Sequence, residues 1–89
     1  MRTIVRKTRF KKDFKKLLSS GKNMEKLAET LRILQEGQQL PERYRDHALI
    51  GDHAGYRECH ISPDWLLIYQ TTETKLILVR TGSHSELFG

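Results

Sequence analysis

A chain of 89 residues supports one small hydrophobic core, and its 37% hydrophobic and 30% charged residues are typical of a well-solvated globular domain. No apolar run approaches the roughly 20 residues of a transmembrane helix, and no apolar block follows the basic N-terminal residues as in a secretory signal. The one cysteine, Cys59, excludes an internal disulfide and fits a reducing compartment. We therefore expect a single domain over residues 1–89, located in the cytoplasm and without membrane contact.

Positive charge is concentrated in the first half of the chain, although the formal net charge is only +5. Residues 1–45 hold 13 Lys/Arg and 5 Asp/Glu, whereas residues 46–89 hold 3 Lys/Arg and 6 Asp/Glu. Such a distribution is typical of a surface that binds a polyanion, although solubility alone explains it equally well.

The first half is predicted to contain a strand followed by two helices. Residues 3–5 form a short β-branched run, and Thr8 is placed to cap a helix over residues 8–20. This helix has an apolar stripe, formed by Phe10, Phe14, Leu17 and Leu18. Its other faces carry the cations Lys11, Lys12, Lys15 and Lys16.

The second helix is predicted to be capped by Asn23 and to end at Gly37. Its apolar stripe consists of Met24, Leu27, Ala28, Leu31 and Leu34. Because only a few residues join the two helices, we expect an antiparallel helix pair that packs on one face of a sheet.

From residue 44 the hydrophobic pattern becomes strand-like. An edge segment is predicted over 47–51, an alternating strand over 56–61, an apolar strand over 65–69 and a last strand over 75–81. The alternation places Glu58 and His60 on one side of their strand, opposite Cys59 and Ile61. This order predicts an α+β fold in which an N-terminal strand and two helices pack on a small antiparallel sheet, followed by a short C-terminal helical segment.

All four histidines lie in the second half of the chain, and they are His47, His53, His60 and His84. Imidazole exchanges a proton near neutral pH, so two of them suit general acid and general base catalysis. His60 and Asp64 flank a turn at Pro63, and we expect the carboxylate to lie beside the imidazole. His53, in a glycine-containing turn, is expected to face solvent.

Other residue types add binding groups and exclude several chemistries. Arg57 and Arg80, predicted on neighbouring strands, are available for phosphate, while Trp65 favours a place in the core. No spacing typical of a zinc site, a phosphate-binding loop or a nucleophile elbow is present, so we expect no metal and no cofactor.

Five segments of the second half together resemble the YafQ branch of the RelE/ParE toxin superfamily. They are residues 46–49, 55–57, 60–69, 80–84 and 87–89, while the first half matches by its layout alone. The resemblance implies a RelE-like fold and a bacterial type II toxin that enters the ribosomal A site and cleaves mRNA without a metal. It also implies a cognate antitoxin, with which the toxin forms a complex that binds operator DNA.

The resemblance also implies roles for individual residues. The positions that match the family's catalytic set are His47, His60, Asp64 and His84. We expect His84 to be the general acid, His60 the base oriented by Asp64, and His47 an assistant, although exchanging acid and base fits the sequence equally well. The expected substrate-binding residues are Arg57, Trp65, Arg80 and Phe88, and the expected rRNA contacts are Lys11, Lys12, Lys15 and Lys16.

Two positions depart from the family pattern. Glu58 stands where close relatives carry a shorter Asp, which leaves its catalytic part open, and Ala48 stands where Pro is usual. Two further hypotheses also stay open. One is a ParE-like inhibitor that binds DNA gyrase without catalysis, and the other is an inactive relative kept as an antitoxin-binding or DNA-regulatory module. A toxin that only binds its target has no need for several titratable histidines, which favours the nuclease.

Overall fold

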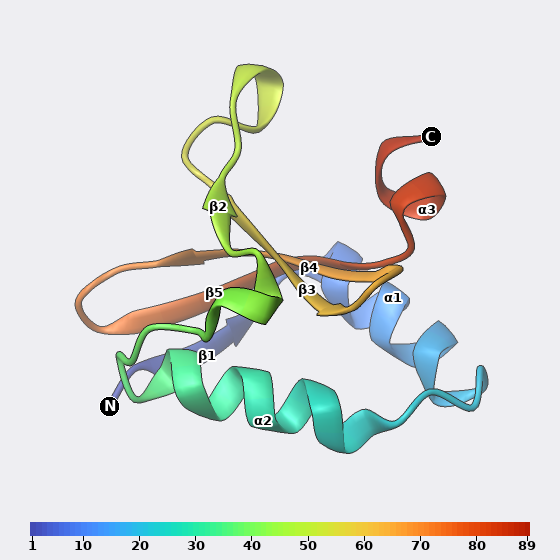
Figure 1. The fold of residues 1–89 in the computed structure, drawn as a ribbon, viewed down its shortest axis with the longest axis horizontal. Helices are drawn as coiled ribbons and strands as arrows, with labels where there is room; N and C mark the ends of the chain where they lie inside the picture. Colours follow the sequence, from blue (N-terminus) through green and yellow to red (C-terminus); the bar gives the residue numbers. More distant parts are fainter.

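The computed structural model describes residues 1–89, which form a five-stranded sheet with two helices on one face (Figure 1). The strands are β1 (Thr3–Arg6), β2 (His47–Ala48), β3 (Arg57–Ser62), β4 (Trp65–Thr71) and β5 (Lys75–Gly82). The helices are α1 (Thr8–Leu18), α2 (Met24–Gln35) and α3 (His84–Phe88), with short 3₁₀ turns η1 (Glu42–Tyr44) and η2 (Gly51–His53). The order of elements is the one that the sequence predicts. None of the helices is both long and apolar enough to cross a membrane.

The strands are arranged in the order β1-β5-β4-β3-β2. The pairs β2–β3, β3–β4 and β4–β5 are antiparallel, as expected, but β1 pairs parallel with β5. The fully antiparallel sheet predicted from the sequence is therefore wrong at this edge. β1 and β5 are separated by both helices and three strands, so no hairpin turn fixes their relative direction.

β4 runs through the middle of the sheet and is buried on both faces. Trp65, Leu67 and Tyr69 face the helices and join the main core, whereas Leu66 and Ile68 are buried on the opposite face. This double burial accounts for the almost unbroken apolar run in the sequence. The face that carries Leu66 and Ile68 also carries the candidate site.

The two helices contribute to one core but do not pack along each other. α1 packs along β5, and α2 packs across β3 and β5, so the predicted antiparallel helix pair is wrong (Figure 1). Each buried stripe differs from the predicted one at one position. In α1, Leu18 at the end of the helix is 59% exposed. In α2, Thr30 is buried while Ala28 is exposed. The face of α2 that packs on the sheet therefore includes Thr30 in place of Ala28.

The helix ends are defined by different interactions. The N-cap of α1 is Lys7, without a side-chain hydrogen bond, and Thr8 is the first helical residue, so the predicted cap is wrong. Asn23 caps α2 as predicted, because its side chain accepts a hydrogen bond from the Glu25 N–H. Gly37 follows α2 with φ of 77°, a left-handed conformation that glycine adopts without steric cost.

The thiol of Cys59 is expected to be unreactive in the folded protein. It is buried in the core, and this burial raises its pKa well above the ordinary value of a cysteine. Since the thiolate is the reactive form, an aromatic disulfide reagent should release no thiol signal from native protein and one equivalent after unfolding in urea. Fast reaction of the native protein would contradict this burial.

Candidate active site

Polar side chains gather on the sheet face opposite α1 and α2. Residues directly across an antiparallel pair share a face, so the strand register defines rows that cross the sheet. The first row consists of His47, Glu58, Ile68 and Arg80, and the second of His60, Leu66 and Gly82. The register thus places two of the predicted catalytic histidines and Arg80 on one face.

A buried carboxylate, that of Glu58, lies between two imidazoles. Its Oε1 is 3.5 Å from Nε2 of His47 and 3.8 Å from Nε2 of His60, and the residue is only 4% exposed. Nδ1 of His47 lies 2.8 Å from the carbonyl oxygen of Arg45. Because a carbonyl only accepts hydrogen bonds, Nδ1 of His47 carries a proton and Nε2 faces the carboxylate. Glu58 was left out of the predicted site, although the strand alternation already placed it beside His60.

The first residue of α3, His84, completes the group of imidazoles. Its ring centre is 6.5 Å from that of His60 and 5.5 Å from that of Phe88. The backbone N–H of His84 donates a hydrogen bond of 3.2 Å to Oδ1 of Asp64 in the β3–β4 turn. His84 and His60 therefore come together although they are 24 positions apart in sequence.

A capping box fixes the start of α3. The Ser83 N–H donates to Oε1 of Glu86 at 2.8 Å, and the Glu86 N–H donates to Oγ of Ser83 at 3.2 Å. The first of these bonds, with help from Lys16 at 3.2 Å, lowers the pKa of the Glu86 carboxyl. Gly82 has φ of 155°, which favours glycine, and a Cβ there would lie 2.9 Å from Oε1 of Glu86, so a larger residue would displace the carboxylate of this box.

Asp64 does not orient His60, as the sequence led us to expect. It makes no hydrogen bond or ion pair with His60 and instead accepts from the backbone of His84. The pairing of β3 with β4 is irregular between His60 and Ser62, and such a bulge changes the direction of the side chains that follow. Glu58 takes the place beside His60 that was predicted for Asp64.

Arg57 lies outside the site. It alternates with Glu58 along β3 and faces the helix side, where its Nη2 is 3.0 Å from Oδ2 of Asp46. The Tyr69 hydroxyl donates to the same carboxylate, and the hydrogen bond to Asp46 raises the pKa of the Arg57 guanidinium. β4 also separates β3 from β5, so Arg57 and Arg80 are not on neighbouring strands. Arg57 is therefore paired with Asp46 and directed away from the residues of the candidate site.

Arg80 is on the predicted face, but its charge is already paired. Its Nε donates to Oδ2 of Asp13 at 2.7 Å and its Nη2 to Oδ1 at 3.2 Å, and its side chain is 21% exposed. The same carboxylate accepts from the Thr81 N–H, so α1 is fastened to the end of β5. The bond to Asp13 raises the pKa of the Arg80 guanidinium.

Trp65 is a core residue and does not reach the site surface. It is 2% exposed, and its indole N–H donates to Oγ1 of Thr81 at 3.0 Å. The Thr81 hydroxyl in turn donates to the carbonyl of Leu66 at 2.8 Å. In this structure Trp65 therefore presents almost no surface for the direct substrate contact that the resemblance implied.

Phe88 and His53 extend the site toward the β2–β3 connection. Phe88 is 42% exposed, and its ring is 5.6 Å from that of His53 in an edge-on contact. His53 is exposed, as predicted, but no local pattern placed it against α3. The predicted rRNA-binding lysines are all exposed on α1, and one of them, Lys16, pairs with Glu86.

Solved structures of the same architecture define the class of protein. The chain superposes on YafQ from Escherichia coli BL21(DE3) with a TM-score of 0.94 at 39% identity over the whole of both chains. It superposes equally well, at 0.94 and 44% identity, on a copper-bound mutant toxin from Helicobacter pylori, covering 99% of this chain and 100% of that one. The fold is thus that of a small α+β bacterial toxin, and the predicted fold class is confirmed.

Sequence comparison identifies the family. The family model described as a bacterial toxin of type II toxin-antitoxin systems, YafQ, matches residues 2–89. The mRNA interferase toxin YafQ of Escherichia coli K12 is 42% identical over 81 residues, which cover 90% of this chain and 88% of that protein. The chain belongs to the YafQ toxin family, as the resemblance in its second half predicted. The names of these relatives agree with the expected enzyme class, an endoribonuclease.

Proposed function

We propose that this protein is a ribosome-dependent mRNA endonuclease that uses acid–base catalysis without a metal ion. The observation that carries the proposal is that the buried Glu58 lies beside His47 and His60, and that His84 lies next to His60, on the sheet face opposite α1 and α2. Relatives named as mRNA interferases support the substrate class.

The proposed reaction needs no reactant other than RNA. A base removes the proton of a ribose 2′-OH, the 2′-oxygen attacks the adjacent phosphorus, and the bond from phosphorus to the 5′-oxygen breaks while an acid protonates that oxygen. The products are a 2′,3′-cyclic phosphate and a 5′-hydroxyl. In-line attack places the two reacting oxygens on opposite sides of phosphorus, so base and acid must approach from two directions. Two imidazoles with centres 6.5 Å apart meet this requirement for one phosphodiester.

We assign His60 as the base and His84 as the acid. Glu58 lies beside His60 and His47, and a neighbouring carboxylate stabilises the imidazolium that forms when His60 accepts a proton. Asp64 is a positioning residue, because it holds the backbone of His84. Phe88 offers an exposed ring on which a base can stack, and Arg80, on the same face and paired with Asp13, keeps donor groups near the reacting phosphate.

Replacing Glu58 by Gln is expected to slow cleavage about tenfold to a hundredfold, less than the loss of a histidine that transfers the proton itself. The substitution removes the charge beside His60 and His47 with almost no change in volume. Glu58→Asp, which retains the charge, should keep most of the activity. Single-turnover cleavage rates and thermal unfolding midpoints would be measured for both variants. A Glu58→Gln rate equal to that of the parent would remove Glu58 from the mechanism.

The partner in the cell is proposed to be a small antitoxin that binds and neutralises this protein. The E. coli DinJ–YafQ complex supports this, since its toxin superposes on this chain with a TM-score of 0.90 at 40% identity over both whole chains. We further propose that the toxin–antitoxin complex binds operator DNA, and that Lys11, Lys12, Lys15 and Lys16 contact rRNA through phosphate groups.

The test uses a reconstituted translation reaction with a defined mRNA, alongside a supercoiling assay with DNA gyrase. Protein stripped of transition metals with a chelator should cleave the mRNA at A-site codons at an undiminished rate, and gyrase should be unaffected. Gyrase inhibition without RNA cleavage would favour the ParE-like inhibitor. Neither activity, with binding of a coexpressed antitoxin intact, would favour the inactive module.

A further inference from the structure

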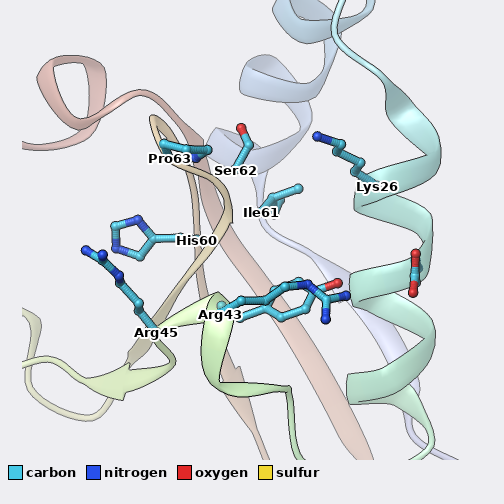
Figure 2. A pocket seen from close by; sticks show the side chains of 9 residues that line it. Lys26, Arg43, Arg45, His60, Ile61, Ser62 and Pro63 are labelled. Atoms are coloured by element: carbon cyan, nitrogen blue, oxygen red, sulfur yellow. The ribbon is translucent and has the colours of Figure 1, made fainter.

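A basic pocket of about 490 Å³ lies beside the candidate active site, at the edge of β3 (Figure 2). It is enclosed by α2, η1 and the turn between β3 and β4. The residues that matter for its chemistry are Lys26, Glu29, Arg43, Arg45, His60 and Ser62. Its volume falls within the roughly 300–1,000 Å³ of typical ligand sites, so it has room for a nucleotide unit.

The cations of this pocket are unpaired. Lys26, Arg43 and Arg45 form no ion pair, whereas Arg57 on β3 and Arg80 on β5 each have an aspartate partner. Glu29 is the one acidic residue in the pocket wall. Three cations against one carboxylate around the same pocket produce a positive potential that favours an anion.

Two of these cations are held by the surrounding structure. The Arg43 guanidinium lies 5.0 Å from the centre of the Tyr44 ring, and Tyr44 is anchored in the core. Arg45 has φ of 49°, and it is the one residue other than glycine with a left-handed backbone. This conformation directs its carbonyl to His47, while its side chain extends beside His60 (Figure 2). Such a backbone is unfavourable for a residue with a Cβ. The contact between the Arg45 carbonyl and His47 joins the wall of the pocket to the active site.

We propose that this pocket binds the mRNA phosphate next to the scissile one, through Lys26, Arg43 and Arg45. The proposal rests on the proposed function and names a subsite for it. RNA is favoured over an acidic protein segment because the pocket and the site share His60, so a strand positioned for cleavage at His60 extends directly into the pocket. Arginine suits this task because its planar group donates two parallel hydrogen bonds to a phosphate.

The test combines protein variants with mRNAs in which single phosphates near the cut are replaced by neutral methylphosphonates. Single-turnover cleavage on programmed ribosomes would be titrated with toxin to obtain a half-saturating concentration and a maximal rate. Arg43→Gln and Lys26→Gln, both at exposed positions, are the test variants. Lys75→Gln, an exposed cation at the start of β5 and outside the pocket, is the matched control. Thermal unfolding midpoints would show that all three variants are folded.

One methylphosphonate adjacent to the scissile position should raise the half-saturating concentration of the parent and of Lys75→Gln about tenfold. The same substitution should have a clearly smaller effect on Arg43→Gln and on Lys26→Gln, which each already lack one of the three contacts, because two changes to one interaction are not additive. If the effects of the methylphosphonate and of the protein substitution were additive at every position, the proposal would be overturned. If Arg43→Gln and Lys26→Gln cleaved RNA like the parent but bound an oligoglutamate peptide more weakly, the pocket would instead be a site for an acidic protein segment. Failure of the parent to cleave any mRNA would refute the proposed function itself.

Discussion

Replacing His84 by Ala is expected to slow mRNA cleavage about 10²-fold to 10⁴-fold, the usual contribution of a general acid. The variant should remain folded, because the imidazole is exposed and the structural hydrogen bond of this residue is made by its backbone N–H to Asp64. Single-turnover cleavage on programmed ribosomes and thermal unfolding would be measured on the same preparations. A slow but fully folded variant would place the imidazole in the chemistry.

Added imidazole provides the control for this variant. A small imidazole that enters the space left by His84 should restore part of the cleavage rate, which a purely structural defect would not allow. His60→Ala should slow cleavage by a comparable factor. It should also remove the acidic limb of the pH–rate profile, which belongs to the base, whereas His84→Ala should remove the alkaline limb, which belongs to the acid. Unchanged cleavage by His84→Ala would remove His84 from its proposed role.

Replacing Trp65 by Ala is expected to lower the free energy of unfolding by about 3–5 kcal/mol, as is usual for a large buried aromatic side chain. Trp65 belongs to one buried cluster with residues of both helices and donates to Thr81, so its removal leaves a cavity in the core. Small domains have total stabilities of about 5–15 kcal/mol, so this loss is a large part of the whole. Trp65 is the one tryptophan in the chain, so the variant has no tryptophan fluorescence to follow. Urea unfolding is therefore followed by circular dichroism.

Trp65→Phe distinguishes a core role from a substrate contact. Phenylalanine retains most of the buried apolar area, and the Thr81 hydroxyl keeps its bond to the Leu66 carbonyl, so the variant should lose about 1–2 kcal/mol. Its cleavage rate should be close to that of the parent. A large loss of cleavage at near-parental stability would show that the indole acts directly on the substrate.

Local sequence patterns predicted most of the fold because they record burial. The apolar run of β4, the alternation in β3 and the stripes of α1 and α2 correspond to surfaces that are buried in the structure. The direction of β1 was missed, because pairing between distant segments leaves no local periodicity. The exposed Leu18 shows the same limit at a helix end, where the last turn extends beyond the sheet.

The candidate site was predicted in its residue types but only partly in its geometry. Strand alternation already separated Arg57 from His60, yet the face that the helices cover is decided by tertiary packing. The bond between Arg80 and Asp13 joins residues that are 67 positions apart, and no spacing rule reveals it. Asp64, in the turn after an irregular stretch of β3, accepts from the backbone of His84, and Glu58 is the carboxylate beside the imidazoles.

In the proposed mechanism the ribose 2′-OH of the mRNA is the nucleophile. The most direct test is ribosome-bound cleavage of an mRNA with a single 2′-deoxy nucleotide at the position whose 3′-phosphate is cut. We predict that cleavage at that bond is abolished, while the all-ribose mRNA is cut to a 2′,3′-cyclic phosphate and a 5′-hydroxyl. Continued cleavage of the 2′-deoxy bond would show that water or a protein group attacks the phosphorus, and would contradict the mechanism.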